Sequence, residues 1–328
     1  MLSRVADSIY WMSRYIERAE NVARFIDVNL HLMLDLPTGS DQQWRPLVDT
    51  TGDHEEFARR FGEATQANVI QFLTLDPDNP NSILSCLRAA RENARSVREV
   101  ISSEMWEQLN KFYLMVNSAG TDPDVLADPH EFFSNVRMSS HLFVGVTEAT
   151  MTHGEGWHFG RLGRMLERAD KTSRILDVKY YILLPTVAHV GTTFDDLQWA
   201  AVLRSTSAFE MYRKTHGRID PRRIVEFLLL DTEFPRAIHH CLIASRESIH
   251  AITGTPTGLF RNPAEQLLAQ LCADLAYGQV DDIVNAGLHE YLDGLQTNMN
   301  QVGTSVAETF FAAKMAPPST RKRTAIRA

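Results

Sequence analysis

The chain has 328 residues, of which 44% are hydrophobic and 23% are charged, and its formal net charge at pH 7 is −8. This composition is typical of a soluble globular protein and excludes an intrinsically disordered chain. The negative charge argues against nucleic acid or an anionic membrane as a partner. Because the longest apolar runs are far shorter than the roughly 20 residues that a membrane-spanning helix needs, we expect no membrane segment. The N-terminus shows no secretory signal, so a cytoplasmic location is expected.

Helical periodicity dominates the chain from its N-terminus. We expect a first long helix from Ser3 to Leu36, where Pro37 ends it, and a second from about Gly156 to Pro185. Between them, further helices are expected at Asp41–Phe61, Glu63–Leu75, Pro80–Glu99, Ser102–Ser118 and Pro129–Met151. A loop rich in Gly, Thr and Pro follows at Thr253–Pro263. The pattern predicts an all-α fold of helical bundles.

The chain also matches itself. A shift of 150 residues lays Arg14, Glu17, Arg18, Ala19, Arg24, Asp27 and Val28 on Arg164, Glu167, Arg168, Ala169, Arg174, Asp177 and Val178. A shift of 155 lays Trp44, Cys86, Arg91 and Glu92 on Trp199, Cys241, Arg246 and Glu247, and a shift of 159 lays His130 on His289. We therefore predict two tandem, divergent copies of one helical-bundle unit, related by a pseudo-two-fold axis. The units are residues 1–151 and 152–315, followed by a basic, disordered tail at 316–328.

The first long helix has an apolar face and, opposite it, an ionic face. The ionic side chains on the two long helices are Arg14, Glu17, Arg18 and Arg24 in the first copy and Arg164, Glu167, Arg168 and Arg174 in the second. Charge runs on helices are usually solvated, but retention of these charges through divergence favours specific partners. One interpretation is a buried ion network that fixes helix register. The other is a cleft in which arginines hold a carboxylate or phosphate.

The two interpretations assign roles to the same residues. For the network, we expect Arg91-Glu92 to face Glu17-Arg18 and Arg246-Glu247 to face Glu167-Arg168, with signs reversed on antiparallel helices. For the cleft, the candidate catalytic carboxylates are Glu17 and Glu167. The candidate ligand-binding residues are Arg14, Arg18, Arg24, Arg91, Glu92, Arg164, Arg168, Arg174, Arg246 and Glu247.

Three segments carry a resemblance to a known family: Arg4–Glu20, Gly163–Asp170 and Leu197–Trp199. They closely resemble the bacterial alpha-E family, an all-helical domain named for its Glu-Arg motif, which falls here on Glu17-Arg18 and Glu167-Arg168. The resemblance extends over essentially the whole chain. It implies association with circularly permuted ATP-grasp ligases and transglutaminase-like peptidases, and a role in making, attaching or removing a peptide or amide tag. It implies no chemistry for the alpha-E component itself.

Other chemical signals are weak. His153 and His158 are five residues apart and lack the one-face geometry of a helical zinc site, so we expect no metal. No glycine-rich phosphate loop follows a strand, so no nucleotide cofactor is expected. Cys86, Cys241 and Cys272 are too few for a disulfide framework and are expected to be buried thiols in a reducing compartment.

Two functions from different classes remain. The first is a helical adaptor that docks the ATP-grasp ligase, or its peptide substrate, between the two units. The second is an enzyme that acts on an amide or peptide through Glu17 or Glu167. The sequence does not decide between them, nor whether the protein forms homo-oligomers.

Overall fold

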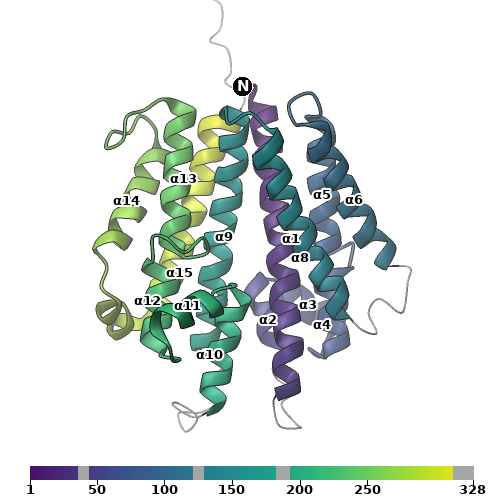
Figure 1. Cartoon of the computed structure of the whole chain (residues 1–328), viewed down its shortest axis with the longest axis vertical. Helices are drawn as coiled ribbons and strands as arrows, with labels where there is room; N and C mark the ends of the chain where they lie inside the picture. Colours follow the sequence, from purple (N-terminus) through teal and green to yellow (C-terminus); the bar gives the residue numbers. More distant parts are fainter. Residues whose placement is uncertain (36–43, 121–128, 182–192, 313–328) are drawn as a thin grey trace, which may run out of the picture.

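The computed structural model describes residues 1–35, 44–120, 129–181 and 193–312, and every regular element within these ranges is a helix (Figure 1). The basic tail at 316–328 lies outside the described residues. The first-half helices are α1 (Ser3–Asp35), α2 (Arg45–Thr51), α3 (His54–Phe61), α4 (Gln66–Thr74), α5 (Ile83–Ser96), α6 (Ser103–Ala119) and α8 (Pro129–Thr150). The second-half helices are α9 (Glu155–Tyr181), α10 (Thr193–Ser205), α11 (Phe209–His216), α12 (Pro221–Leu230), α13 (Ile238–Thr253), α14 (Pro263–Tyr277) and α15 (Val280–Val306), followed by a π-turn, η3 (Ala307–Phe311). The all-α prediction is confirmed.

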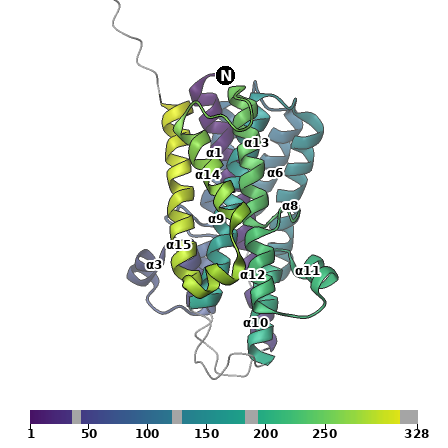
Figure 2. The ribbon, with the colours of Figure 1, turned by 90° about the vertical axis from the view of Figure 1, so that its left-hand side faces the viewer.

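The two long helices α1 and α9 lie side by side at the centre of the molecule (Figure 1). Helices α5 and α8 pack on the outer side of α1, and α13 and α15 pack on α9. Figure 2 shows α13, α14 and α15 standing together in front of the central helices. The contact between α1 and α9 therefore joins the two halves along their length.

The predicted helix boundaries are close to the observed ones, with one correction. The helix expected over Asp41–Phe61 is two helices, α2 and α3, because Gly52 adopts a left-handed conformation with φ of 81° and ends α2. Residues 41–43 lie outside the described part of the chain. The expected Thr253–Pro263 loop is present between α13 and α14.

The buried apolar side chains form two clusters, one for each half. Each cluster includes one aromatic ring from the other half: Phe159 of α9 packs in the first cluster, and Tyr10 of α1 packs in the second. Phe310 and Phe311 of η3 pack against both clusters, and the Phe311 ring lies 5.3 Å from that of Tyr10. The three cysteines are buried and free, as predicted, and burial raises the pKa of Cys86 and of Cys241 to about 12.

Glycines on α9 allow its close approach to α1. A Cβ atom at Gly163 would collide with the backbone oxygen of Tyr10, and one at Gly160 would lie 3.1 Å from the Ser13 hydroxyl. Small residues at such a crossing let the helix backbones come close. This proximity brings the charged side chains of α1 within reach of α9.

Candidate functional site at the α1–α9 interface

Glu167 of α9 is completely buried and is held by arginines from α1. Arg18 donates from Nε to one carboxylate oxygen at 2.6 Å and from Nη2 to the other at 3.1 Å. Arg14 adds a third hydrogen bond from Nε at 2.8 Å. The Lys171 ammonium lies 3.8 Å away, so Glu167 is surrounded by cations.

Glu17 of α1 is held in the reciprocal way by α9. Arg168 forms a bidentate pair with it, with Nε and Nη2 at 2.8 and 2.9 Å from the two carboxylate oxygens. Arg236, in the turn just before α13, donates to Glu17 at 3.3 Å and to Glu20 at 2.8 Å. Each Glu-Arg motif thus supplies the carboxylate for the other motif's arginine, across an interface of residues about 150 positions apart.

The electrostatics keep both carboxylates ionised. Burial alone would raise the pKa of Glu167, but Arg18, Arg14 and Lys171 together hold that pKa well below its ordinary value. Burial likewise opposes ionisation of Glu17, and Arg168 and Arg236 lower the pKa of its carboxyl group. Reciprocally, the glutamates raise the pKa of Arg18 and Arg168 against the effect of burial.

The network continues along both helices toward their C-terminal ends. On α1, Arg24 pairs with Glu20 one turn away, and on α9, Arg174 pairs with Asp170 with its Nε at 3.0 Å. Arg24 and Glu20 are both buried. The sequence predicted an ionic face on α1 opposite its apolar face. This ionic face is therefore buried in the interior, as the apolar face is.

The predicted partners of the motif are wrong. Arg91 donates to Asn110 at 2.7 Å and lies beside Glu92, and neither contacts the Glu17–Arg168 pair. Glu247 is exposed and pairs with Arg161 at 3.0 Å, and Arg246 is only partly buried. These residues lie on α5 and α13 and make other contacts, whereas the motif side chains pair with one another between α1 and α9. The interpretation of the motif as a buried ion network agrees with the geometry, but the arginines come from the other central helix.

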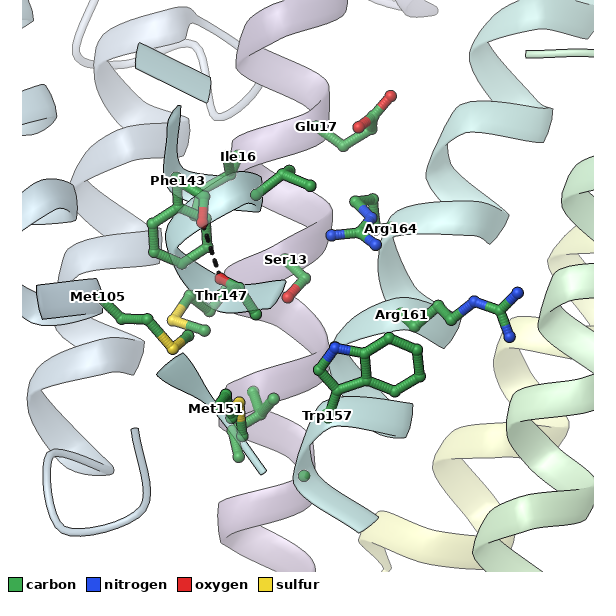
Figure 3. A pocket seen from close by; sticks show the side chains of 15 residues that line it. Ser13, Ile16, Glu17, Met105, Phe143, Thr147, Met151, Trp157, Arg161 and Arg164 are labelled. Atoms are coloured by element: carbon green, nitrogen blue, oxygen red, sulfur yellow. Dashed lines mark hydrogen bonds between the residues drawn. The ribbon is translucent and has the colours of Figure 1, made fainter. Parts of the chain in front are cut away.

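A narrow pocket with an internal volume of about 20 Å³ lies beside this network (Figure 3). Its apolar wall is formed by α1, α6, α8 and α9 through Ile9, Met12, Ile16, Met105, Phe143, Val144, Met151 and Trp157. Its polar wall is formed by Ser13, Glu17, Thr147, Arg161 and Arg164. Figure 3 shows Arg164 between Glu17 and Ser13, on the polar side of the pocket. We call this space the α1–α9 pocket.

Arg164 has spare hydrogen-bonding capacity in this pocket. Its Nη2 donates to Glu148 at 3.2 Å, but its buried Nε makes no hydrogen bond to any residue that the structure describes. Burial, and then the nearby Arg168, lower the pKa of Arg164, so its charge is less well compensated than that of Arg14 or Arg18. A buried cation of this kind favours an anionic group nearby.

The sequence missed Arg236, Glu20, Glu148 and Ser13 as parts of this site. Two of them carry a usable signal. Arg236 falls, at the shift of 155, on Asn81, whose side-chain oxygen accepts from Arg18 at 2.8 Å. Glu20 falls, at the shift of 150, on Asp170. Glu148 and Ser13 carry no such signal, because neither falls on a charged residue of the second half.

The arrangement is suited to fixing the packing of α1 on α9 and to binding a small molecule, and less suited to proton transfer. Two carboxylates with lowered pKa values that are already hydrogen-bonded to arginines are poor proton donors and weak bases at neutral pH. A narrow, mostly apolar pocket with an under-compensated arginine at one side favours a small anionic group such as a carboxylate. The site defines a class of all-helical protein in which two central helices interlock through reciprocal Glu-Arg pairs.

The comparison with protein families agrees with this class. The chain belongs to the Alpha-E family, described as a predicted alpha-helical domain with a conserved ER motif, and the family model matches residues 1–311. In this chain the motif falls on the two interlocked pairs, Glu17-Arg18 and Glu167-Arg168.

Relatives come from mycobacteria. The uncharacterized protein Mb2597 of Mycobacterium bovis and the uncharacterized protein Rv2567 of Mycobacterium tuberculosis are each 24% identical to this chain over 334 residues. Each alignment covers 94% of this chain but only 37% of the relative, so the chain spans little more than a third of the length of these relatives. No solved structure matches the chain significantly. No described helix is long and apolar enough to cross a membrane.

Proposed function

We propose that this chain is a cytoplasmic helical adaptor of a bacterial ATP-grasp amidoligase system, which holds the carboxylate end of a peptide or amino acid. The α1–α9 pocket is the binding site in this proposal. The partners are a circularly permuted ATP-grasp ligase and a transglutaminase-like peptidase, as the resemblance to the family implies. The adaptor presents a bound peptide for synthesis or modification of a peptide or amide tag.

The single observation that carries this proposal is the position of Arg164. Its guanidinium is buried beside a wall of methionine and aromatic side chains, and it has an unpaired donor. The C-terminal residue of a peptide places an apolar side chain next to a free carboxylate. These two groups match the apolar wall of the pocket and the Arg164 guanidinium beside it. Methionine side chains also adapt to apolar groups of different shape, as a carrier of varied peptides requires.

The state of the two glutamates supports an adaptor over an enzyme. Glu167 is enclosed by three cations and does not line the α1–α9 pocket. Glu17 lines the pocket, but its two oxygens are occupied by Arg168. An amide-modifying enzyme needs a glutamate that exchanges protons near neutral pH, and the pKa of each glutamate is lowered instead.

We further propose that the two halves, residues 1–151 and 152–315, arose by duplication and are related by a pseudo-two-fold axis. Reciprocity of contacts supports this. Arg18 meets Glu167 as Arg168 meets Glu17, and the Asp27–His130 pair at 2.8 Å has its counterpart in Asp177–His289 at 2.7 Å.

A binding experiment tests the pocket. The probes are N-acetyl-alanyl-leucine with a free carboxylate and the same dipeptide as its C-terminal amide, titrated into the full chain and followed by NMR chemical shifts of the methionine methyl groups. The acid is expected to shift the Met105 and Met151 resonances, and the amide to bind at least about tenfold more weakly. Arg164→Gln should remove this preference, whereas Arg95→Gln, at an exposed arginine on α5, should keep it. Equal binding of acid and amide by the wild-type chain would contradict the proposal.

A reconstitution experiment tests the system. The circularly permuted ATP-grasp ligase of the same bacterium, ATP and candidate amino acids are combined with and without this chain, and product formation is measured. The wild-type chain and Glu167→Gln are both expected to support product, if Glu167→Gln remains folded by circular dichroism, because no proton transfer is assigned to that carboxylate and it does not line the α1–α9 pocket. A folded Glu167→Gln chain that abolishes product would instead favour the enzyme.

A further inference from the structure

A second polar cluster lies near the C-terminal end of α1, away from the α1–α9 pocket. Asp27 and His31 are one turn apart on α1, and His130 approaches them from the first turn of α8. The Asp27 Oδ1 atom lies 2.8 Å from His130 Nδ1 and 3.8 Å from His31 Nδ1, and the two imidazole centroids are 4.2 Å apart. One ligand atom from each residue lies within 4.8 Å of the others.

These distances suit a first-row divalent metal ion. Bonds of about 2.0–2.1 Å in a tetrahedral site separate neighbouring ligand atoms by roughly 3.3 Å, so ligand atoms within 4.8 Å of one another reach that separation by small side-chain rotations. His31 Nδ1 donates to the backbone oxygen of Asp27 at 2.9 Å, which leaves His31 Nε2 as the nitrogen that can bind the ion. Two imidazoles with one carboxylate are a donor set for zinc or iron(II), whereas magnesium and calcium prefer oxygen ligands.

The carboxylate is oriented by a neighbour that is not a ligand. Arg137 of α8 donates to Asp27 Oδ2 at 2.9 Å, which leaves Oδ1 facing the histidines. The buried position of Asp27, 4% exposed, limits its rotation. Such outer contacts commonly fix the geometry of metal ligands.

The cluster opens onto a hollow of about 1120 Å³, including the solvent space at its mouth. Asp27 and His31 line it, together with Arg24, Arg137, Arg204 and Glu210. Three protein ligands with an open side are typical of zinc sites that keep a position for an exchangeable ligand. Since three arginines share the hollow, the fourth ligand is expected to be an anion, such as a carboxylate or phosphate.

The second half of the chain offers a natural comparison. Its matching pair, Asp177 and His289, is 2.7 Å apart, but the residue that falls on His31 at the shift of 150 is Tyr181. The second pair therefore has the carboxylate and one imidazole without the second imidazole. An Asp–His pair is common to both halves, and the extra histidine is particular to the first.

We propose that Asp27, His31 and His130 bind one zinc-type divalent ion, with an open coordination position that faces the hollow. The inference is independent of the proposed function of the α1–α9 pocket, because the two sites share no lining residue.

The test is metal binding by the full chain after treatment with a chelator and dialysis. Zn²⁺ is titrated calorimetrically, and Co²⁺ serves as a spectroscopic probe because a tetrahedral Co²⁺ site absorbs strongly in the visible range. The wild-type chain is expected to bind one ion and to show these bands. His31→Ala, at a side chain that is 58% exposed, should weaken Zn²⁺ binding by about 100-fold or more while the helix content stays unchanged.

Two matched controls locate the ion. His289→Ala removes the histidine of the second Asp–His pair, and His153→Ala removes an exposed histidine close to Trp157 and His158. Both should bind Zn²⁺ as the wild type does, and a tenfold excess of Mg²⁺ should displace nothing. The proposal is overturned if the wild-type chain takes up no Zn²⁺ at one equivalent, if His31→Ala binds unchanged, or if His153→Ala loses the ion.

Discussion

The two motif glutamates, Glu17 and Glu167, have the same sequence context and the same kind of partner, yet their surroundings differ. Glu167 receives three hydrogen bonds from two arginines, has a lysine nearby and has no exposed surface. Glu17 receives a bidentate pair and a longer bond from Arg236, and it also borders the α1–α9 pocket. The same motif thus closes the interface at one position and forms part of a pocket wall at the other.

The difference between the surroundings of Glu17 and Glu167 comes from a further arginine near each carboxylate. In the position where Arg14 completes the shell of Glu167, the matching residue in the second half is Arg164, which turns to Glu148 instead of Glu17. Arg236 takes a place near Glu17 from the turn that precedes α13. Arg164 is thereby left to face the α1–α9 pocket.

The largest effect is expected from Glu167→Gln. Loss of the buried charge leaves Arg14 and Arg18 unpaired at the interface, so the free energy of unfolding at pH 7 should fall by about 3–5 kcal/mol. Urea unfolding followed by circular dichroism measures it. Glu92→Gln, at an exposed carboxylate, should change it by less than about 0.5 kcal/mol. Equal effects of the two substitutions would mean that the interface does not depend on the motif.

The same variant has a defined pH dependence. Because the pKa of Glu167 is lower in the folded chain than in the unfolded chain, its contribution is complete above the ordinary carboxyl pKa and is lost as pH falls toward the folded value. The stability difference between the wild type and Glu167→Gln should therefore shrink below about pH 4.5. A difference that grows on acidification would contradict the assignment.

A smaller effect is expected from Gly163→Ala. The added methyl group meets the Tyr10 carbonyl and forces α1 and α9 apart, which should cost about 1–3 kcal/mol of unfolding free energy. Gly145→Ala on α8, where no atom lies within 4 Å of the new Cβ, is the control and should gain about 0.5–1 kcal/mol from better helix propensity. Destabilisation by both would point to a general loss of helix packing.

The smallest effect is expected from His289→Ala, at the second Asp–His pair. The hydrogen bond to Asp177 raises the pKa of His289, so the pair stabilises the fold below pH 6.5 and its contribution disappears as pH rises through the folded pKa. Thermal unfolding should show a lower Tm for His289→Ala at pH 5.5 and no difference at pH 8.5. A pH-independent shift would show that the histidine acts by packing alone.

Much of the fold follows from the sequence because helix periodicity and stop signals are local. The ends of α1 and α8 and the loop before α14 were predictable from proline and glycine positions. The partners of Glu17 were not, because the helical wheel gives the direction of a side chain but not the neighbouring helix. The Arg-Glu pair on α5 and the Glu-Arg pair on α9 look equally suitable, and only the close approach at Gly163 selects α9. His31 escaped notice because its partner His130 is 99 positions away and it has no counterpart in the second half.

The exchange of Tyr10 and Phe159 between the two apolar clusters has an evolutionary consequence. Each half contributes both a glutamate and an arginine to the contact, and each lends the other an aromatic ring, so neither half completes its own interior. In the proposed duplication, a gene for a single half would already encode both the glutamate and the arginine of the interlocked Glu-Arg pairs. Its product is expected to assemble with a twin, and fusion of two such genes would convert that dimer into a chain free to specialise one side.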